Sequence, residues 1–340
     1  MPKKVVISGY YGFDNFGDDA ILSVLCDKLK SLNAGVTVIS SNPSKTANDY
    51  GVKAVKNFDI KTLVKTIKSS DILISGGGSL LQDVTSLKSL LYYSFVIACA
   101  QFFKKDVIIF AQGIGPLKRK ISQNIVKNLI SKAKFVSVRD KKSLELLQNW
   151  GINAYLVNDP VFNIKIKDVP KNYAVGIQLR DFPSLSEAFL NNLADNVLKY
   201  FNGRKIELFV FQKSLDTVVC KHFERILKTK NPQVDTKIIY YKNRTETFKR
   251  ISQLDCMIAM RFHAVIAALK AGVKTAGINY DVKVQKLAEE ADIPLISLKS
   301  SGNDYEKIFG QLKSLNPLIL SNFASSKHLD WSGIEKLFSV

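Results

Sequence analysis

The feature that most constrains this chain is a regular alternation of short apolar runs with longer segments of helical periodicity. Five apolar runs in the first half have the length and composition of strands: residues 5–8, 36–40, 71–75, 106–111 and 135–138. The alternation starts again with runs at residues 173–179, 206–211, 237–240, 255–259 and 275–278. Strands that alternate with helices favour a parallel sheet covered by helices. We therefore predict two Rossmann-like, doubly wound α/β domains.

A polar, proline-punctuated stretch separates the two series of strands. It includes residues 158–160 and the lysine-rich residues 165–171, a composition typical of an interdomain linker. We expect an N-terminal domain at 1–164, a C-terminal domain at 165–320, and a tail at 321–340 whose short amphipathic helix packs near the domain junction. A chain of 340 residues agrees with two domains, because single cores rarely exceed about 250–300 residues.

Cysteine spacing and hydropathy indicate the compartment. The four cysteines show no CxxC spacing, which argues against a structural zinc or a disulfide framework and fits a reducing cytoplasm. No apolar stretch of signal-peptide length precedes the first strand, and the longest apolar run, residues 90–103, is shorter than the ~20 residues that cross a bilayer. We expect a cytoplasmic protein in which residues 90–103 form a buried helix.

The chain is strongly basic, with a formal net charge of +19 and a pI of about 9.6. Lysines make up 41 of its 49 basic residues, and they are spread along the whole sequence. No RNP, zinc-finger or clustered arginine-aromatic element is visible, so charge alone does not support nucleic-acid binding. Diffuse lysine instead favours anionic substrates or anionic lipids. Association with the inner face of the cell membrane is then expected, with release at high salt.

A basic residue and a titratable residue lie together at residues 260–263. Arg261 and His263 stand between the apolar run 255–259 and a helix-like segment at 264–272. If the backbone is still extended there, the two side chains point to the same side. Ligands collect at this carboxyl end of parallel strands. The alternative is a helix-capping histidine beside a surface arginine.

Acidic and amide residues follow the first strand. The glycines of residues 9–17 permit a tight turn into a helix, and we expect Asp18 or Asp19 to cap that helix. Asp14, Asn15 and Asp18 are candidates for hydrogen bonds to sugar hydroxyls. The segment is neither GxGxxG nor a P-loop, so it does not support a dinucleotide site or a Walker-type phosphate site.

Glycines also follow two further strands. Residues 76–78 are a glycine triplet, and we expect Gly77 and Gly78 to bring backbone N–H groups near an anion or a sugar at a helix start. A flexible turn is the alternative. Gln112 opens a second glycine-containing loop after the next strand. Two such loops side by side would line a crevice.

Three of the eight arginines, Arg139, Arg180 and Arg261, stand where predicted strands end. Arginine suits the bidentate recognition of carboxylate or phosphate. Pairing of each arginine with a neighbouring aspartate is the structural alternative. Lys283 follows the strand predicted at 275–278, which places it at the same sheet edge.

Together these motifs resemble the polysaccharide pyruvyl transferase family over nearly the whole chain. The segments that carry the resemblance, in order, are residues 9–12 with 15–18, then 76–79, 112–116, 138–140, 261–263 and 280–283. The opening segment is most similar to Gram-positive members that modify a secondary cell-wall polymer.

The resemblance implies a GT-B-like pair of Rossmann-like domains facing a central cleft that holds phosphoenolpyruvate. It implies Arg139, Arg261 and Lys283 as donor-binding residues and His263 as the catalytic acid, with Asp14, Asn15, Asp18, Gly77, Gly78, Gln112 and Arg180 as possible acceptor or phosphate contacts. The implied acceptor is an N-acetylmannosamine unit of a lipid-linked precursor, modified on its 4- and 6-hydroxyls. We expect no redox cofactor and no metal, since the three histidines have no ligand spacing.

The residue chemistry agrees with this expectation. Phosphoenolpyruvate carries a carboxylate and a phosphate, which fixed cations can bind. His263 can give a proton near neutral pH, because the ordinary pKa of histidine is ~6.5. The base that takes the sugar proton stays open among Asp14, Asp18 and Asp83. Two rival functions are a GT-B glycosyltransferase that uses a nucleotide sugar and a non-catalytic protein that binds anions or sugars.

Overall fold

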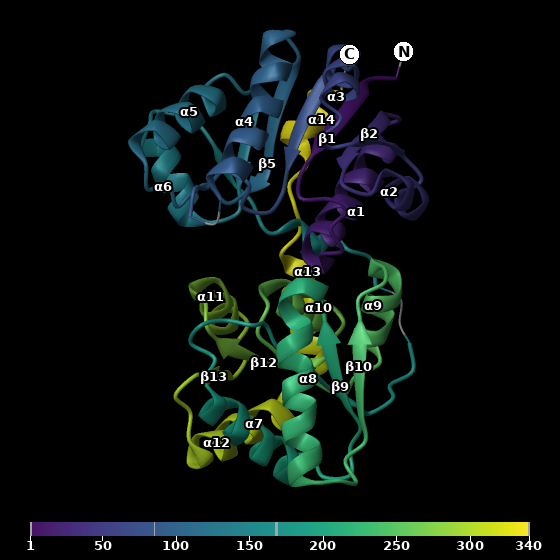
Figure 1. Cartoon of the computed structure of the whole chain (residues 1–340), viewed down its shortest axis with the longest axis vertical. Coiled ribbons are helices and arrows are strands. Elements are labelled where there is room, and N and C mark those ends of the chain that lie inside the picture. Colours follow the sequence, from purple (N-terminus) through teal and green to yellow (C-terminus); the bar gives the residue numbers. More distant parts are fainter. Residues whose placement is uncertain (1, 85, 167–168, 339–340) are drawn as a thin grey trace. The chain divides into compact units, whose positions relative to one another are not determined.

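The computed structural model describes residues 2–84, 86–166 and 169–338, and it divides into two compact units (Figure 1). The first unit comprises Met1–Ile164 with His328–Val340, and the second comprises Lys165–Lys327. Each unit is built on one parallel β-sheet, with helices in the connections between strands. Both ends of the chain belong to the first unit.

The sheet of the first unit has seven parallel strands in the order β3-β2-β1-β4-β5-β6-β7. The strands are β1 (Lys4–Ser8), β2 (Gly35–Ser40), β3 (Lys53–Lys56), β4 (Ile72–Gly76), β5 (Asp106–Gln112), β6 (Phe135–Val138) and β7 (Tyr155–Leu156). The helices are α1 (Phe16–Ser31), α2 (Pro43–Tyr50), α3 (Ile60–Lys68), α4 (Leu87–Phe102), α5 (Lys120–Ile130), α6 (Lys141–Asn149), the 3-10 helix η1 (Pro160–Asn163) and α14 (Ser332–Glu335).

Burial explains the layers of this unit. The central strands are apolar at nearly every position, as expected for a parallel sheet that helices cover on both faces. Alternate strand residues face opposite sides, so that Val6, Leu73 and Val107 join one core cluster with the inner faces of α3, α4 and α5. The tail packs in the same unit, because Trp331 stacks on Phe110 at a ring distance of 5.3 Å.

The sheet of the second unit has six parallel strands in the order β10-β9-β8-β11-β12-β13. The strands are β8 (Val175–Gln178), β9 (Ile206–Val210), β10 (Thr236–Tyr240), β11 (Cys256–Ala259), β12 (Lys274–Asn279) and β13 (Leu295–Ser297). The helices are α7 (Glu187–Tyr200), α8 (Lys213–Lys230), α9 (Arg244–Ser252), α10 (Phe262–Lys270), α11 (Val282–Glu290), α12 (Gly302–Ser314) and α13 (Pro317–Ser326).

The architecture confirms the prediction of two doubly wound parallel sheets. All ten predicted strands are present, and the structure adds three that the periodicity does not reveal: β3, β7 and β13. These three strands are short and lie at sheet edges, where partial exposure weakens the apolar signal. The second strand of each unit, β2 or β9, occupies the same position in the strand order of its sheet.

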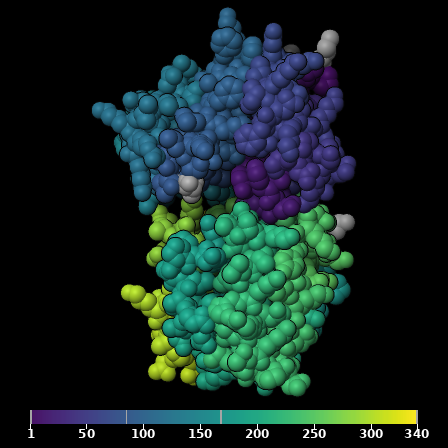
Figure 2. Space-filling view, viewed as in Figure 1, coloured from purple at the N-terminus to yellow at the C-terminus, as the bar shows by residue number. Residues whose placement is uncertain are grey.

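The apolar run at residues 90–103 does form a helix, but the expectation that this helix is buried is wrong for its outer face. Leu91, Phe95 and Phe102 of α4 are 47%, 41% and 79% exposed. The space-filling view shows the blue segment that contains α4 reaching the surface of the first unit (Figure 2). Within the described part of the chain, no helix is long and apolar enough to span a membrane.

Candidate active site

In both sheets the strand order reverses direction once, between β1 and β4 in the first unit and between β8 and β11 in the second. Successive helices leave to opposite faces at such a point, which opens a crevice outside the carboxyl ends of the two strands. The residues that follow these four strands are therefore the first place to look for ligand-binding groups.

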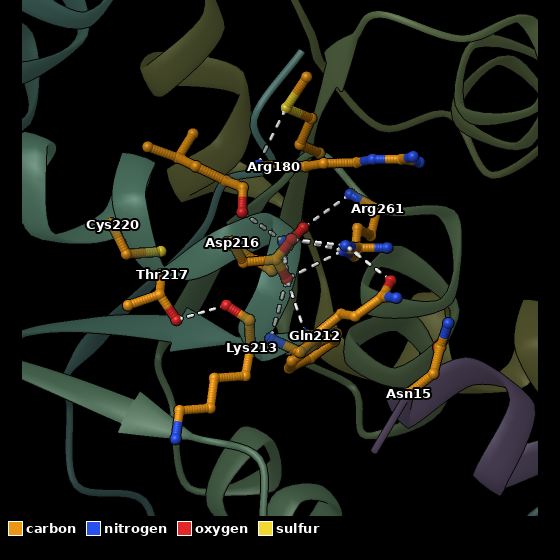
Figure 3. Close-up of polar contacts among 12 residues, drawn as sticks. Asn15, Arg180, Gln212, Lys213, Asp216, Thr217, Cys220 and Arg261 are labelled. Atoms are coloured by element: carbon orange, nitrogen blue, oxygen red, sulfur yellow. Dashed lines mark hydrogen bonds and ion pairs between the residues drawn. The ribbon is translucent and has the colours of Figure 1, made fainter. Parts of the chain in front are cut away.

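Arg261 follows β11 and is held by a buried carboxylate. Its Nε lies 3.1 Å and 3.0 Å from the two carboxylate oxygens of Asp216, and its Nη2 lies 2.5 Å from Oδ1 (Figure 3). The Asp216 side chain is fully buried, whereas that of Arg261 remains 13% exposed. These contacts use Nε and Nη2, so the fork of the guanidinium is fixed on one side and Nη1 lies outside the pair.

Asp216 is itself fixed by the start of helix α8. Its Oδ2 accepts backbone N–H bonds from Phe211 and Gln212, both at 3.0 Å. Gln178 completes the network, because its Oε1 accepts the Arg261 backbone N–H at 2.7 Å. Burial, with a smaller contribution from Asp216, raises the pKa of the adjacent Cys220 thiol to about 12, so this thiol stays neutral beside the ion pair.

Arg180 brings a second guanidinium to this edge. It follows β8, and its backbone N–H donates to Met260 Sδ at 3.3 Å, which links the ends of β8 and β11. Burial raises the pKa of Tyr280, while Arg180 and Arg261 each act to lower it. The Tyr280 phenol therefore lies within electrostatic reach of both guanidiniums. Figure 3 shows the Arg180 and Arg261 side chains extending to the same side of the network.

His263 and Lys283 lie in the first turns of two helices that follow neighbouring strands. Helix α10 begins at Phe262, so His263 is its second residue, and the Phe262 and His263 rings meet edge to face at 5.5 Å. The premise that the backbone is still extended at His263 is wrong, because the extended conformation ends at Arg261. Lys283 follows β12, where Asp281 caps α11 by accepting the Lys283 N–H at 2.7 Å.

In the first unit, Asp18 lies at the reversal between β1 and β4. A methyl group added to Gly78 would stand 3.1 Å from Asp18 Oδ1, so the carboxylate lies directly over that glycine. Burial and the negative charge of Asp18 raise the pKa values of Tyr10 and Tyr93. Both phenols therefore remain protonated near neutral pH beside a carboxylate.

The other two candidates in this segment have different surroundings. Asn15, not an aspartate, caps helix α1, since its Oδ1 accepts the Gly17 N–H at 3.0 Å; the expectation that Asp18 or Asp19 is the cap is wrong. Asp14 is exposed and forms an ion pair with Lys45. Its φ of 54° places it in the left-handed region at the tip of the turn.

The glycine triplet at residues 76–78 does not lie at the start of a helix, although the sequence predicts that it does. Gly77 and Gly78 have φ angles of 60° and 71°, which favour glycine, but helix α4 begins only at Leu87, so the triplet does not open a helix. The Gly77 N–H donates to the Phe110 carbonyl at 2.8 Å and is engaged within the sheet. Gln112 is fully buried, and its Nε2 donates to Ser75 Oγ at 2.7 Å, which ties β5 to β4.

Arg139 follows β6 and pairs with an aspartate distant in sequence. Its Nη1 lies 2.9 Å from Asp159 Oδ2, and its Nη2 donates to Ser79 Oγ at 3.3 Å. The Arg139 side chain is 8% exposed and that of Asp159 is 2% exposed. The Nε atoms of Arg139 and Arg180 are buried without a hydrogen-bond partner within the described residues.

Residues 15–282 match a protein family described as polysaccharide pyruvyl transferase. The chain belongs to this family. The match covers the strand reversal of the second unit, and it includes all of the residues just described except Tyr10, Asp14 and Lys283.

Solved structures similar to this pyruvyl transferase family member define its fold. They include a UDP-GlcNAc 2-epimerase from Methanocaldococcus jannaschii (12% identity, TM-score 0.64, 96% of this chain and 98% of that one) and a putative UDP-N-acetylglucosamine 2-epimerase from Listeria monocytogenes (9%, 0.68, 99% and 95%). A third is Anabaena Alr3699/HepE in complex with UDP and glucose (13%, 0.65, 98% and 98%). These likenesses show that the fold is GT-B-like. Proteins of curated function give no sequence match.

The sequence did not reveal three residues at the edge of the second sheet: Gln178, Gln212 and Asp216. Asp216 could have been found as a carboxylate in the first turn of the helix after β9, the strand next to β8. Gln178 ends β8 and lies fully buried, which no local pattern distinguishes from a surface glutamine. In the described part of this pyruvyl transferase family member, no group of three or more His, Cys, Asp or Glu side chains could hold a metal ion.

Proposed function

We propose that the protein transfers the pyruvyl group of phosphoenolpyruvate to two hydroxyls of a sugar, forming a ketal and releasing phosphate. The acceptor we favour is N-acetylmannosamine in a lipid-linked cell-wall polysaccharide precursor, with a 4,6-linked ketal. Family membership supports the reaction class, and the similarity of residues 9–18 to cell-wall members supports the acceptor. The reaction as written requires no redox cofactor.

The observation that carries the proposal is the fixed guanidinium of Arg261 beside Arg180. Because Asp216 holds Nε and Nη2, Arg261 presents its remaining donors without losing side-chain freedom on binding. A second cation at the same edge suits a donor that carries both a carboxylate and a phosphate. Lys283 extends this set from the neighbouring strand β12, and Arg139 belongs to it by the family resemblance.

The proposed chemistry begins at the enol double bond. His263 gives a proton to C3, which becomes a methyl group, and positive charge develops at C2. One sugar hydroxyl bonds to C2, the C2–O bond to phosphate breaks, and the second hydroxyl closes the ketal. Two hydroxyl protons are lost in total: one replaces the proton spent on C3, and the other leaves with the phosphate.

Asp18 is the proposed base for the sugar hydroxyl. Asp83 is engaged elsewhere, since its carboxylate accepts N–H bonds from Lys118 at 2.7 Å and Arg119 at 3.0 Å, which lower its pKa and its basicity. Asp14 is tied to Lys45 at the protein surface. Asp18 instead lies over Gly78 at the strand reversal, where the protonated phenol of the half-buried Tyr10 can donate to sugar oxygens.

The deciding experiment is phosphate release from phosphoenolpyruvate by the purified protein, with and without a synthetic lipid-like acceptor that carries N-acetylmannosamine. We expect release that depends on the acceptor and a product heavier by one pyruvyl unit in mass spectrometry. An acceptor that carries N-acetylglucosamine is the matched control for sugar identity. Absence of release with every acceptor tested would contradict the proposal.

A second candidate is a transferase that uses a nucleotide sugar. The observation that favours it is the whole-chain similarity in fold to a UDP-GlcNAc 2-epimerase and to a protein solved with UDP and glucose bound. Supplying UDP-N-acetylglucosamine or UDP-glucose in the same assay separates the two functions. Turnover of the nucleotide sugar without phosphate release from phosphoenolpyruvate would favour this candidate. Binding of phosphoenolpyruvate without turnover of either donor would indicate a non-catalytic anion-binding protein.

A further inference from the structure

Helix α4 is apolar on both of its faces. Its inner face belongs to the core of the first unit, with Leu90, Tyr93, Val96, Ile97 and Ala100 buried. Its outer face carries Leu91, Phe95, Ala98 and Phe102, which are spaced by three or four residues and so form one stripe along the helix. A surface helix of a globular protein ordinarily turns polar residues outward. We call this exposed stripe the α4 face.

A second aromatic group extends the α4 face. Phe58, in the turn before α3, is 70% exposed, and its ring lies 5.4 Å from that of Tyr92 on α4. The Tyr92 hydroxyl donates to the Asn57 carbonyl at 3.0 Å, which fixes this turn against the helix. The exposed apolar groups thus form a connected patch rather than scattered single residues.

The surroundings of the α4 face are rich in basic residues, and Asp59 after Phe58 and Asp106 after Lys105 are acidic neighbours at its border. Helices α3 and α5 both contact α4. Residues 60–70, 86–105 and 117–134, which hold the three helices, contain three, three and six basic residues respectively and no aspartate or glutamate. Lys68 Nζ lies 5.8 Å from the centroid of the Phe103 ring, so a lysine of α3 lies over an aromatic ring beside the end of α4.

We propose that the α4 face docks the protein on an anionic lipid bilayer. Leu91, Phe95 and Phe102 would enter the boundary between headgroups and acyl chains, and the surrounding lysines would lie against anionic headgroups. The long stems of lysine suit such an interface, because they bury methylene groups while the charge stays at the headgroups. A second copy of the chain fits less well, because a self-complementary interface would bring two basic rims together.

This inference does not depend on pyruvyl transfer. It rests on the exposed stripe of α4 and the charge of three helices, and its test requires no turnover. If the reaction proposed above is wrong, the docking surface is unaffected.

The test is flotation of the full chain with vesicles of phosphatidylcholine, alone or mixed in equal parts with phosphatidylglycerol. We expect binding only to the anionic vesicles, weakened by added salt. The double variant F95S/F102S should lower the partition coefficient by about tenfold or more, because two large apolar side chains are lost. The variant K104E/K105E should lower it by a similar factor.

The matched control is V218S/K221E on helix α8. Val218 is 72% exposed and Lys221 is exposed, so the same kinds of side chain are changed in the second unit. This control should bind anionic vesicles as the parent does. Circular dichroism and thermal unfolding of each variant establish that a loss of binding is not a loss of fold.

A tryptophan at the helix end gives a direct measurement of contact. In the variant F102W, lipids brominated on their acyl chains should quench the new fluorescence, whereas V218W should show no added quenching. Failure of the parent to float with anionic vesicles would overturn the proposal, as would unchanged binding of F95S/F102S. A parent dimer that F95S/F102S converts to a monomer, without vesicle binding, would assign the α4 face to a second copy instead.

Discussion

The carboxyl edges of the two sheets have the same topology and opposite chemistry. Both sheets reverse their strand order between the first and fourth strands of the unit, and both place side chains at that point. The edge of the second unit carries the guanidiniums of Arg180 and Arg261, with His263 close by in the sequence. The edge of the first unit carries the Asp18 carboxylate over Gly78, with two protonated phenols.

This difference teaches that the strand reversal fixes where polar side chains gather, and the loop residues decide their charge. The function proposed above assigns the donor to the edge of the second unit and the sugar hydroxyl to the edge of the first. A cationic edge stabilises an anionic donor, and an edge with a carboxylate and hydroxyls suits a sugar with hydroxyls to be deprotonated. If this division of roles is correct, variants at the two edges should affect different kinetic constants.

The largest expected effect is at His263. The variant H263A should lower kcat by about 10²–10⁴, because the proton donor to C3 is lost. Binding of phosphoenolpyruvate, measured by titration calorimetry, should change little. His222 on α8, paired with the exposed Glu187, is the matched control, and H222A should keep full activity. Retention of most activity in H263A would remove this residue from the mechanism.

The next effect is at the edge of the first unit. The variant D18N should lower kcat by about 10²–10³ through loss of the base, with the KM for phosphoenolpyruvate unchanged. Asp27, exposed on the same helix α1, provides the control variant D27N, for which no change is expected. A raised KM for phosphoenolpyruvate in D18N would break the division of roles between the edges.

The role of the planar guanidinium of Arg261, at the carboxyl edge of the sheet in the second unit, can be tested without changing its charge. The variant R261K should raise the KM for phosphoenolpyruvate by about 10–100-fold, because lysine cannot replace the planar fork. Arg250 is a matched control, since its Nε and Nη2 bind the buried Glu207 at 2.8 Å and 2.6 Å. The variant R250K should lower the unfolding free energy and leave KM unchanged. Equal kinetics of R261K and the parent would exclude bidentate donor binding there.

Asp216 should act through Arg261 as a positioning residue. The variant D216N retains the shape of the side chain but loses its charge, and it should raise the KM for phosphoenolpyruvate by about tenfold. The unfolding free energy should fall by about 2 kcal/mol, because a fully buried ion pair is broken. The control E207Q breaks a comparably buried pair away from the strand reversal and should affect stability alone. A purely structural role for Asp216 would make the two variants alike in KM.

The smallest effect is a pH dependence confined to the first unit. Backbone N–H bonds, the one from Lys118 foremost, lower the folded pKa of Asp83 below its ordinary value of 3.8. This group therefore contributes stability above pH 3.8 that is lost as the pH falls through the lower, folded pKa. In urea unfolding, D83N should be less stable than the parent at neutral pH, and the difference should shrink in acid. A constant difference across pH would contradict this contribution.

Local pattern was sufficient to predict the layers and the strand ends. Apolar runs of four to seven residues followed by helical periodicity predict parallel strands, and an arginine directly after such a run must lie near a carboxyl edge. Arg180 and Arg261 could therefore be placed from the sequence. The short edge strands β3 and β7 could not be predicted from the sequence, because their exposed residues lack the apolar signal.

Partnerships between distant residues could not be predicted in the same way. Arg261 and Asp216 are 45 positions apart, and Arg139 and Asp159 are 20 apart. Each pair forms because the strand order brings together two loops that are distant in the sequence. When the strand order is not known, many other carboxylates are equally good candidates as the partner of each arginine. The alternative in which Arg139 pairs with the aspartate next in sequence is not what the structure has, since Arg139 pairs with Asp159 and Asp140 instead caps α6.

The sequence by itself determined the fold class, the two repeated series of strands and the family, because hydrophobic periodicity and short ordered motifs are local properties. Only the tertiary structure decided that Asp216 fixes Arg261, that Asp18 lies over Gly78, and that α4 exposes its outer face. Periodicity shows that a helix face is apolar, but whether that face is covered depends on which elements pack against it. That information is carried by contacts across the chain.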